Sequence, residues 1–299
     1  MICAKNITMK FDDFIALKNM SCNIPDGIIY GLVGSNGAGK STFLRLLSGV
    51  YRPQNGEITV DSDPVYENPD VKKKILYVPD ELYFLPQSNM NAMANFYRAA
   101  YEDFSFERFE KLTKTFGLNP TANINTFSKG MKRQASTILA LSAMPQYLFF
   151  DETFDGLDPV MRNLVKQVIY NDVIERKTTT IITSHSLREL EDTCDQLALL
   201  HKGGIVFESD IQNLKTSLFK VQVAFKERFD QTKFTNIEML NYTQAGSVAT
   251  FIARGDREAV SAAIRAQNPL LLDVLPLNLE EVFIYEMEAL GYAFKDILM

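Results

Sequence analysis

The pattern of apolar and polar positions predicts strands and then a helix in the first part of the chain. Residues 2–30 alternate in polarity as half-buried strands do, with a turn at 25–27. Residues 40–53 place apolar side chains at helical spacing, and a glycine and a proline end that pattern. The Asn-Gly pair at 55–56 then predicts a hairpin turn followed by a short strand.

The pattern next becomes helical and then returns to buried strands. Residues from about 84 to 145 have few β-branched runs and many Ala, Met and Phe, which predicts a helical region. Residues 146–152 and 178–185 are mainly apolar runs that predict buried strands ending in polar side chains. Ligands of open α/β sheets bind at the carboxyl ends of the strands, so both strand ends are candidate site positions.

The last part of the chain has a different pattern. Strands and helices are predicted here at residues 219–225, 247–253, 256–267 and 279–292. This stretch has no glycine-rich loop and no cluster of titratable residues. We therefore predict two domains, residues 1–210 and residues 211–299, and the second is a small α+β domain.

Composition limits the function without identifying it. The chain has 299 residues, 46% of them hydrophobic, which is enough for one large core or two smaller ones. With 31 basic and 37 acidic residues its net charge is −6, which argues against a general nucleic-acid binder. Three cysteines without a CxxC pair suit a reducing cytosol. The sequence shows neither a bilayer-spanning apolar run nor a signal-peptide layout, so we expect a cytoplasmic protein that reaches membranes through a partner.

The segment GLVGSNGAGKSTFLRLLSG at 31–49 carries the strongest chemical signal. It fits G-x-x-x-x-G-K-[ST] between a predicted strand and a predicted helix, where this spacing cradles phosphate. Loop N–H groups point at the anion, Lys40 neutralises the outer phosphates, and the Ser41 hydroxyl can ligate Mg2+. The expected nucleotide-binding residues are Gly34, Ser35, Asn36, Gly37, Ala38, Gly39, Lys40, Ser41 and Thr42. The alternative is a tight turn before a helix.

Two carboxylates and a histidine follow the predicted buried strands. Asp151 can hold Mg2+ through water, and Glu152 can orient or deprotonate an attacking water. Without other motifs, this pair of carboxylates could be a solvated acidic turn. Beside a P-loop the functional interpretation is stronger, because phosphoryl transfer needs a bound metal and a positioned water. His185 follows the second strand as a further candidate, with a structural histidine as the alternative.

The segment NTFSKGMKRQ at 125–134 combines a helix cap with unfavourable charge. Asn125, Thr126 or Ser128 could cap the helix that follows. Basic residues oppose the helix dipole at its start, and a bound anion would resolve that conflict. These residues are Lys129, Lys132 and Arg133. A capped amphipathic helix with a basic first turn is the alternative.

Together these segments resemble the nucleotide-binding subunit of an ABC transporter. The similar motifs are Walker A at 34–42, the signature at 127–131, Walker B in LFFDE, the D-loop at 156–158 and the switch histidine at His185. Phe11 stands where the family has an aromatic residue that stacks on adenine. The resemblance covers residues 2 to about 210.

The resemblance implies an α/β fold of the P-loop NTPase, ABC-type class. Such a fold has a RecA-like core, an N-terminal antiparallel β subdomain and a helical subdomain, here about 84–145, with the small C-terminal α+β domain appended. ATP and Mg2+ are the implied cofactors, and Glu152 and His185 the implied catalytic residues. Ser128 and Gly130 would contact the ATP of a second ATP-binding subunit, in a homodimer or a heterodimer with a related ATPase.

Several residues depart from the motifs of the family and indicate a subgroup within it. Asp80, followed by Glu81, replaces the Q-loop glutamine, and we expect it to bind Mg2+ in the closed state. In the signature, Phe127, Lys129 and Met131 replace the usual leucine, glycine and glutamine. Lys129 and Met131, together with the appended domain that ends in PLNLEEVFIYEM, resemble bacterial ABC-2-type exporter ATPases of the bacitracin- and peptide-efflux kind.

The resemblance predicts an ATP-hydrolysing motor for a separate integral-membrane permease that exports a peptide, antibiotic or lipid-like cargo. The chain would lie at the inner face of the cell membrane through that permease, without a nucleic-acid partner. Tyr83, Phe84 and Leu85 would either receive the permease or pack inside the helical subdomain. The alternatives are an ABC ATPase of DNA repair or translation, and a P-loop kinase or GTPase, although an N-K-x-D guanine motif is absent.

Overall fold

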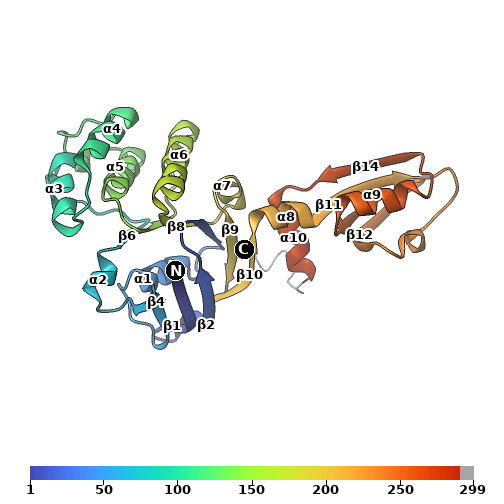
Figure 1. Ribbon diagram of the computed structural model, residues 1–299, viewed down its shortest axis with the longest axis horizontal. Coiled ribbons are helices and arrows are strands. Elements are labelled where there is room, and N and C mark those ends of the chain that lie inside the picture. The colour runs from blue at the N-terminus through green and yellow to red at the C-terminus, as the bar shows by residue number, and fades with distance from the viewer. Residues whose placement is uncertain (290–299) are drawn as a thin grey trace. The chain divides into compact units, whose positions relative to one another are not determined.

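The computed structural model describes residues 1–289, which form two compact units. The first unit comprises residues 1–208 and the second begins at Ser209 (Figure 1). The division falls within strand β10 (Gly204–Asp210), close to the domain boundary expected after residue 210. Among the described helices, none is long and apolar enough to span a membrane.

The first unit is organised around a sheet for which the structure describes six strands, in the order β10-β9-β3-β8-β7-β6. Besides β10 these are β9 (Gln196–His201), β3 (Ile29–Val33), β8 (Thr179–Ser184), β7 (Tyr147–Asp151) and β6 (Ile75–Val78). Strands β9, β3, β8, β7 and β6 pair in parallel, and the central three are buried along their length. Asp151 lies beside Thr183 in the register, so the carboxyl ends of β7 and β8 share one edge.

A second sheet in this unit is antiparallel, with the order β2-β1-β4-β5. Its strands are β1 (Ile2–Phe11), β2 (Phe14–Ile24), β4 (Asn55–Val60) and β5 (Asp63–Pro64). The hairpin turn predicted at 55–56 is wrong, because this Asn-Gly pair begins strand β4. Gly56 has φ +83°, and a Cβ there would lie 2.3 Å from the Lys5 carbonyl oxygen. The glycine therefore permits close pairing with β1.

Helices surround these sheets and position the loops between them. Helix α1 (Lys40–Leu47) contributes Phe43 and Leu47 to a buried core shared with both sheets. The predicted helical region contains α3 (Met90–Ala100), α4 (Phe106–Phe116), η1 (Ile124–Thr126) and α5 (Lys129–Ser142). The other helices described in this unit are α2 (Pro69–Lys72), α6 (Pro159–Arg176) and α7 (Leu187–Glu191). The side chains of Asn89, Ser105 and Ser128 cap α3, α4 and α5.

The second unit contains an antiparallel sheet in the order β12-β13-β11-β14. Its described elements are α8 (Ile211–Ser217), β11 (Leu218–Ala224), η2 (Gln231–Phe234), β12 (Glu238–Ala245), β13 (Val248–Arg254), α9 (Arg257–Arg265), β14 (Leu271–Pro276) and α10 (Leu279–Ala289). Phe234 packs against Phe225 and Phe251 in an aromatic core. Asp256 caps α9, and residues 290–292 of the last predicted helix lie outside the described residues.

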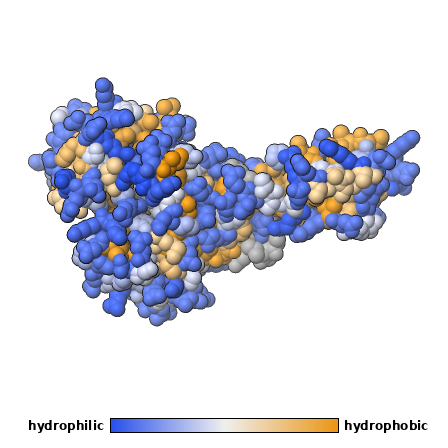
Figure 2. All heavy atoms as spheres, viewed as in Figure 1, coloured by the Kyte–Doolittle hydropathy of each residue, from blue (hydrophilic) through white to orange (hydrophobic). Residues whose placement is uncertain are grey.

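The two units also differ in the surfaces they expose. Over the face shown in Figure 2, polar residues cover most of the first unit, and apolar side chains gather on the second unit where β14 lies. Exposed leucines there are Leu270, Leu271 and Leu275. Among the described strands β14 stands at one end of this sheet, and it exposes Leu271 and Leu275.

Candidate functional site

The glycine-rich loop between β3 and α1 presses its backbone against neighbouring strands. A Cβ on Gly34 would lie 2.4 Å from the Leu200 carbonyl oxygen, and one on Gly39 would lie 2.6 Å from that of Ala16. Gly39 also has φ +111° and begins α1 without a side-chain cap. The loop therefore needs glycine to pack on β9 and β2, and the first N–H groups of α1 remain available to a phosphate.

Lys40 is the first residue of α1, and its buried side chain reaches back to the loop. Its Nζ donates to the carbonyl oxygens of Gly34 at 2.6 Å and Ser35 at 3.2 Å, and lies 3.2 Å from Glu152 Oε1. The side chain is only 6% exposed, so a phosphate entering the loop meets a largely desolvated ammonium group. The loop holds Ser35, Asn36, Gly37 and Ala38, and the first turn of α1 holds Ser41 and Thr42.

Glu152 and His185 meet at the carboxyl ends of β7 and β8. His185 Nδ1 lies 3.0 Å from Glu152 Oε2, and the other carboxylate oxygen faces Lys40. Glu152 has φ +49°, an uncommon conformation for a glutamate, and its N–H donates to Thr183 Oγ1 at 3.0 Å. Lys40, Glu152 and His185 thus form one continuous polar chain, and the half-exposed histidine is accessible to a ligand.

Asp151 is buried and held by two hydroxyl groups. Thr183 Oγ1 donates to Asp151 Oδ1 at 2.7 Å, and the Tyr77 hydroxyl donates to Oδ2 at 3.1 Å. Burial, together with the neighbouring carboxylate, raises the pKa of Tyr77 and keeps its hydroxyl protonated as a donor. A carboxylate and the Ser41 hydroxyl are hard oxygen donors, and this donor set suits Mg2+.

Sequence reasoning missed three hydroxyl-bearing residues that shape this site, Tyr77, Thr183 and Ser184. Thr183 and Ser184 are polar residues at the end of an apolar strand, which is a usable signal that they face the site. Tyr77 gives no such signal, because its contact with Asp151 depends on the pairing of β6 with β7.

The predicted signature segment lies at the start of α5. Ser128 is the cap, and its Oγ accepts from the Met131 N–H at 3.2 Å, whereas Asn125 and Thr126 lie in η1. A Cβ on Gly130 would lie 3.0 Å from the Gly156 carbonyl oxygen. Among the described residues, no hydrogen bond or ion pair links Ser128 or Gly130 with residues 34–42. Within the described part of the chain the signature segment and the P-loop therefore lie at two separate helix starts, α5 and α1, without a direct polar contact.

The contacts of Arg133 correct one sequence prediction, that a bound anion balances the charge of this residue at the start of α5. It is 1% exposed, and its guanidinium donates to Asp80 Oδ1 at 2.6 Å and to the carbonyl oxygens of Asp80 and Pro79 at 3.0 and 3.3 Å. Asp80 therefore balances this charge, and no bound anion is needed to explain it. The same ion pair engages the carboxylate expected to bind Mg2+, so metal binding by Asp80 would compete with Arg133.

Phe11 ends strand β1, just before the turn into β2. The residue is 39% exposed, and its ring packs edge-on against Tyr51, with ring centroids 5.5 Å apart. Ala16, on the following strand, approaches the P-loop glycine Gly39. Phe11 therefore has an exposed surface for stacking, at the end of β1 and just before the strand that supports the loop.

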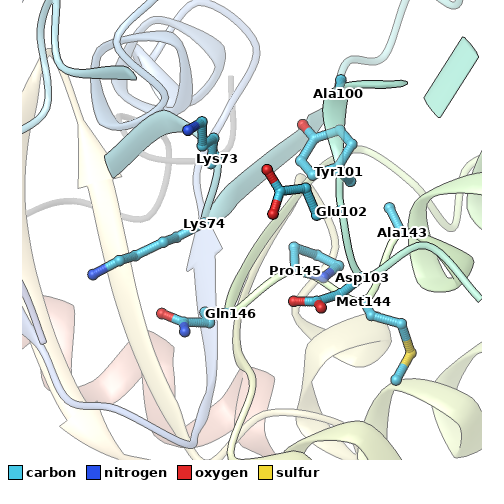
Figure 3. Close-up of a pocket in the computed structure, with 10 residues that line it drawn as sticks. All are labelled: Lys73, Lys74, Ala100, Tyr101, Glu102, Asp103, Ala143, Met144, Pro145 and Gln146. Atoms are coloured by element: carbon cyan, nitrogen blue, oxygen red, sulfur yellow. The ribbon is translucent and has the colours of Figure 1, made fainter. Parts of the chain in front are cut away.

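A separate pocket of about 200 Å³ lies at the amino ends of the parallel strands, opposite the candidate site (Figure 3). Its lining includes Lys74 and Gln146, which immediately precede β6 and β7, whereas the site residues follow β7 and β8. In Figure 3 the Lys74 side chain points away from Glu102 and Asp103. The charged residues around this pocket therefore do not converge as those around Lys40 do.

Known proteins share this sequence pattern. A family model described as ABC transporter matches residues 17–155. The chain is 32% identical over 285 residues to the ABC transporter ATP-binding protein YtrB of Bacillus subtilis (strain 168), covering 95% of this chain and 97% of that protein. It is 29% identical to the daunorubicin/doxorubicin resistance ATP-binding protein DrrA of Streptomyces peucetius, over 68% of this chain and 63% of that protein.

A solved structure shares the fold. It is an ATP-binding cassette in a dimeric post-hydrolysis state bound to ADP and Pi, with a TM-score of 0.63, 22% identity and coverage of 71% of this chain and 99% of that one. The predicted P-loop, ABC-type α/β fold is thereby confirmed. The relatives' names favour transport over DNA repair or translation. The chain belongs to the ABC transporter ATP-binding proteins and is, as its sequence predicted, an ATP-hydrolysing subunit of that family.

Proposed function

We propose that this subunit uses ATP hydrolysis to drive export of a peptide, antibiotic or lipid-like cargo through a separate membrane permease. The observation that carries this proposal is the polar chain of Lys40, Glu152 and His185 beside a loop built for phosphate. The name of DrrA, a drug-resistance protein, supports export as the direction of transport. Selection of the cargo would belong to the permease.

The roles proposed for the site residues follow from their contacts. The N–H groups of residues 35–37 and 39 and the Lys40 ammonium bind the phosphates of ATP, whereas the N–H groups of Gly34 and Ala38 already donate to backbone carbonyl oxygens. Ser41 and Asp151 would hold Mg2+, which when bound offsets the negative charge of the phosphates. A phosphate oxygen competes for Lys40 with Glu152, so that carboxylate becomes free to accept a proton from the attacking water.

Three further residues have supporting roles in this proposal. His185 orients the Glu152 carboxylate and, being half exposed, can donate to a phosphate oxygen. The exposed ring of Phe11 stacks on the adenine. Asp80 contributes to Mg2+ binding when its ion pair with Arg133 opens.

A second ATP-binding subunit would complete each site. Ser128 and Gly130 lie at the start of α5, in the segment that resembles the family's signature, and the P-loop leads into a different helix, α1, so we place these two residues against the ATP of a partner arranged head to tail. The dimeric state of the solved cassette supports this arrangement. A two-fold interface is isologous and creates two equivalent composite sites in a homodimer. A related ATPase as partner would make the sites unequal.

Mixing two inactive variants tests the shared site. Lys40→Ala and Ser128→Arg should each lack activity, because every site of each variant is damaged. In a one-to-one mixture about half the dimers carry one intact site, so phosphate release should reach up to about a quarter of the wild-type rate. As a control, Lys40→Ala mixed with Glu152→Gln should show no recovery, because both residues lie in the same half-site. An inactive first mixture would contradict the shared site.

The permease contact is proposed on an apolar groove next to Asp80. Tyr83 is 77% exposed and Leu85 42% exposed, whereas Phe84 is 7% exposed and packs inside. Tyr83 and Leu85 line a groove of about 380 Å³ together with Phe96 and Tyr97 of α3. A permease segment seated in this groove would hold the subunit at the inner face of the cell membrane.

A further inference from the structure

A second polar network lies directly behind the turn that carries His185. Ser184, at the end of β8, donates from Oγ to Glu189 Oε2 at 2.7 Å. Glu189 is in α7 and its other oxygen, Oε1, lies 3.2 Å from Arg162 Nη1 on α6. The carboxylate is only 14% exposed. Glu189 is therefore shared between the His185 turn and helix α6.

Ser184 connects this network to the P-loop as well as to the histidine. Its Oγ accepts from the Ser186 N–H at 3.0 Å, which closes the turn around His185. Its carbonyl oxygen accepts from the Gly34 N–H at 3.4 Å. Because the residue is 1% exposed, these contacts are made away from water. A shift of Ser184 therefore moves the adjoining histidine relative to the phosphate loop.

Arg162 extends the network in the other direction. Its Nη2 lies 3.5 Å from the carbonyl oxygen of Leu157, in the segment 156–158 that resembles a D-loop. Gly156 in that segment approaches Gly130 at the start of α5. The planar guanidinium serves two acceptors from different segments at once, which a lysine ammonium does not reproduce. A connected path thus runs from the start of α5 through Arg162 and Glu189 to His185.

We propose that Arg162 and Glu189 are positioning residues that hold His185 against Glu152 and make this geometry depend on the segment 156–158. A partner subunit's ATP that displaces the start of α5 would alter the His185 turn through this path. The inference rests on the catalytic role proposed for His185, and it assigns no contact with ATP to either positioning residue.

The test uses Glu189→Gln in the full chain. Glutamine keeps an acceptor for the Ser184 hydroxyl and loses the ionic attraction to Arg162. We expect kcat for ATP hydrolysis to fall about tenfold while KM for ATP stays within about twofold, because only the orientation of the histidine changes. Arg162→Met should likewise lower kcat about tenfold and leave KM for ATP within about twofold. In a His185→Ala background, Glu189→Gln should lower the residual rate less than about twofold, since its target is already absent.

The ion pair between Arg254 and Glu286 in the second unit offers a matched control. Its atoms lie 3.0 Å apart and its side chains are 30% and 13% exposed, against 3.2 Å, 31% and 14% for Arg162 and Glu189. Glu286→Gln should leave both kcat and KM unchanged. A Glu286→Gln variant that lowers kcat as much would assign the effect to general stability and overturn the proposal.

The remaining outcomes separate this inference from the proposed function. A normal Glu189→Gln variant beside an impaired His185→Ala variant would overturn the positioning role alone. An equal loss from Glu189→Gln with and without His185 would also overturn it. A His185→Ala variant with the wild-type rate would overturn the proposed catalytic role and this inference together.

Discussion

The two units bury different kinds of side chain, and the difference marks where the chemistry lies. The first unit buries Lys40, Asp151 and Ser184 at one edge of a parallel sheet. The core cluster described in the second unit is aromatic and aliphatic, with Phe234 at its centre. Buried ionic and polar groups stabilise a fold poorly unless they are paired. The first unit also buries Asp172 on α6 and Thr179 at the start of β8, so Lys40, Asp151 and Ser184 are assigned to the site by their position at the phosphate loop and at the ends of β7 and β8.

Two helices of the first unit differ in how their N-terminal N–H groups are satisfied. Helix α1 begins at Gly39 without a side-chain cap, whereas the Ser128 hydroxyl caps α5 through the Met131 N–H. An uncapped start leaves backbone donors for a ligand, and a capped start has already used one. A phosphate fits the start of α1 directly, while a phosphate at α5 would have to share Ser128 with its own helix.

The largest effects should come from the polar chain in the first unit. Glu152→Gln should lower kcat about 10²- to 10⁴-fold and retain ATP binding, because it removes only the proton acceptor. Lys40→Ala should lose hydrolysis and also bind ATP more weakly, because Lys40 holds the phosphates. Phosphate release and equilibrium ATP binding measure the two parameters. A Glu152→Gln variant with a near wild-type rate would show that Glu152 is not the base.

Substitutions in the two cores should have similar effects on stability and different effects on ATP hydrolysis. Phe251→Ala in the second unit and Phe43→Ala beneath the P-loop each empty a fully buried site and should each lower the free energy of unfolding by about 3–5 kcal/mol. Only Phe43→Ala should also reduce the ATPase rate under conditions where both variants are folded. Denaturant unfolding and phosphate release check this. Loss of hydrolysis in a folded Phe251→Ala variant would contradict the division of roles.

A smaller effect is expected at Asp80. If its carboxylate binds Mg2+ in the closed state, Asp80→Asn should raise the Mg2+ concentration for half-maximal hydrolysis about tenfold. Asparagine still accepts a hydrogen bond from Arg133, so the loop should keep its position. Equal Mg2+ titration curves for Asp80→Asn, Asp80→Ala and the unaltered chain would exclude a metal role. Asp80 would then serve only to hold Arg133.

The smallest effect on hydrolysis should come from the apolar groove. Tyr83→Asp and Leu85→Asp alter exposed side chains, so the isolated subunit should fold and hydrolyse ATP normally while binding to its permease is lost. Phe84→Asp is the contrasting variant, because it places a charge at a buried position and should destabilise the fold. Normal permease binding by the Tyr83→Asp and Leu85→Asp variants would place the contact elsewhere.

The sequence alone determined the phosphate loop and the strand ends that carry Asp151 and Glu152, and it limited the cap of α5 to Asn125, Thr126 or Ser128. Each is a local feature, because its chemistry is carried by a few neighbouring residues whose spacing sets their geometry. The glycines at 34 and 39 are required by contacts with Leu200 and Ala16, yet their spacing signals the loop without those contacts. The hairpin predicted at 55–56 failed for the opposite reason, since pairing with β1 overrode a local turn preference.

Only the tertiary structure decided which side chains meet. The Tyr77 and Thr183 hydroxyls reach Asp151 because β6, β7 and β8 are neighbours in one sheet. The position of Arg133 at a helix start suggested a bound anion, and the fold supplies Asp80 as its partner instead. Such contacts join segments distant along the chain, and their geometry follows from strand order and helix packing. Spacing along a sequence reveals which groups can act on a phosphate, and the fold decides what holds them in place.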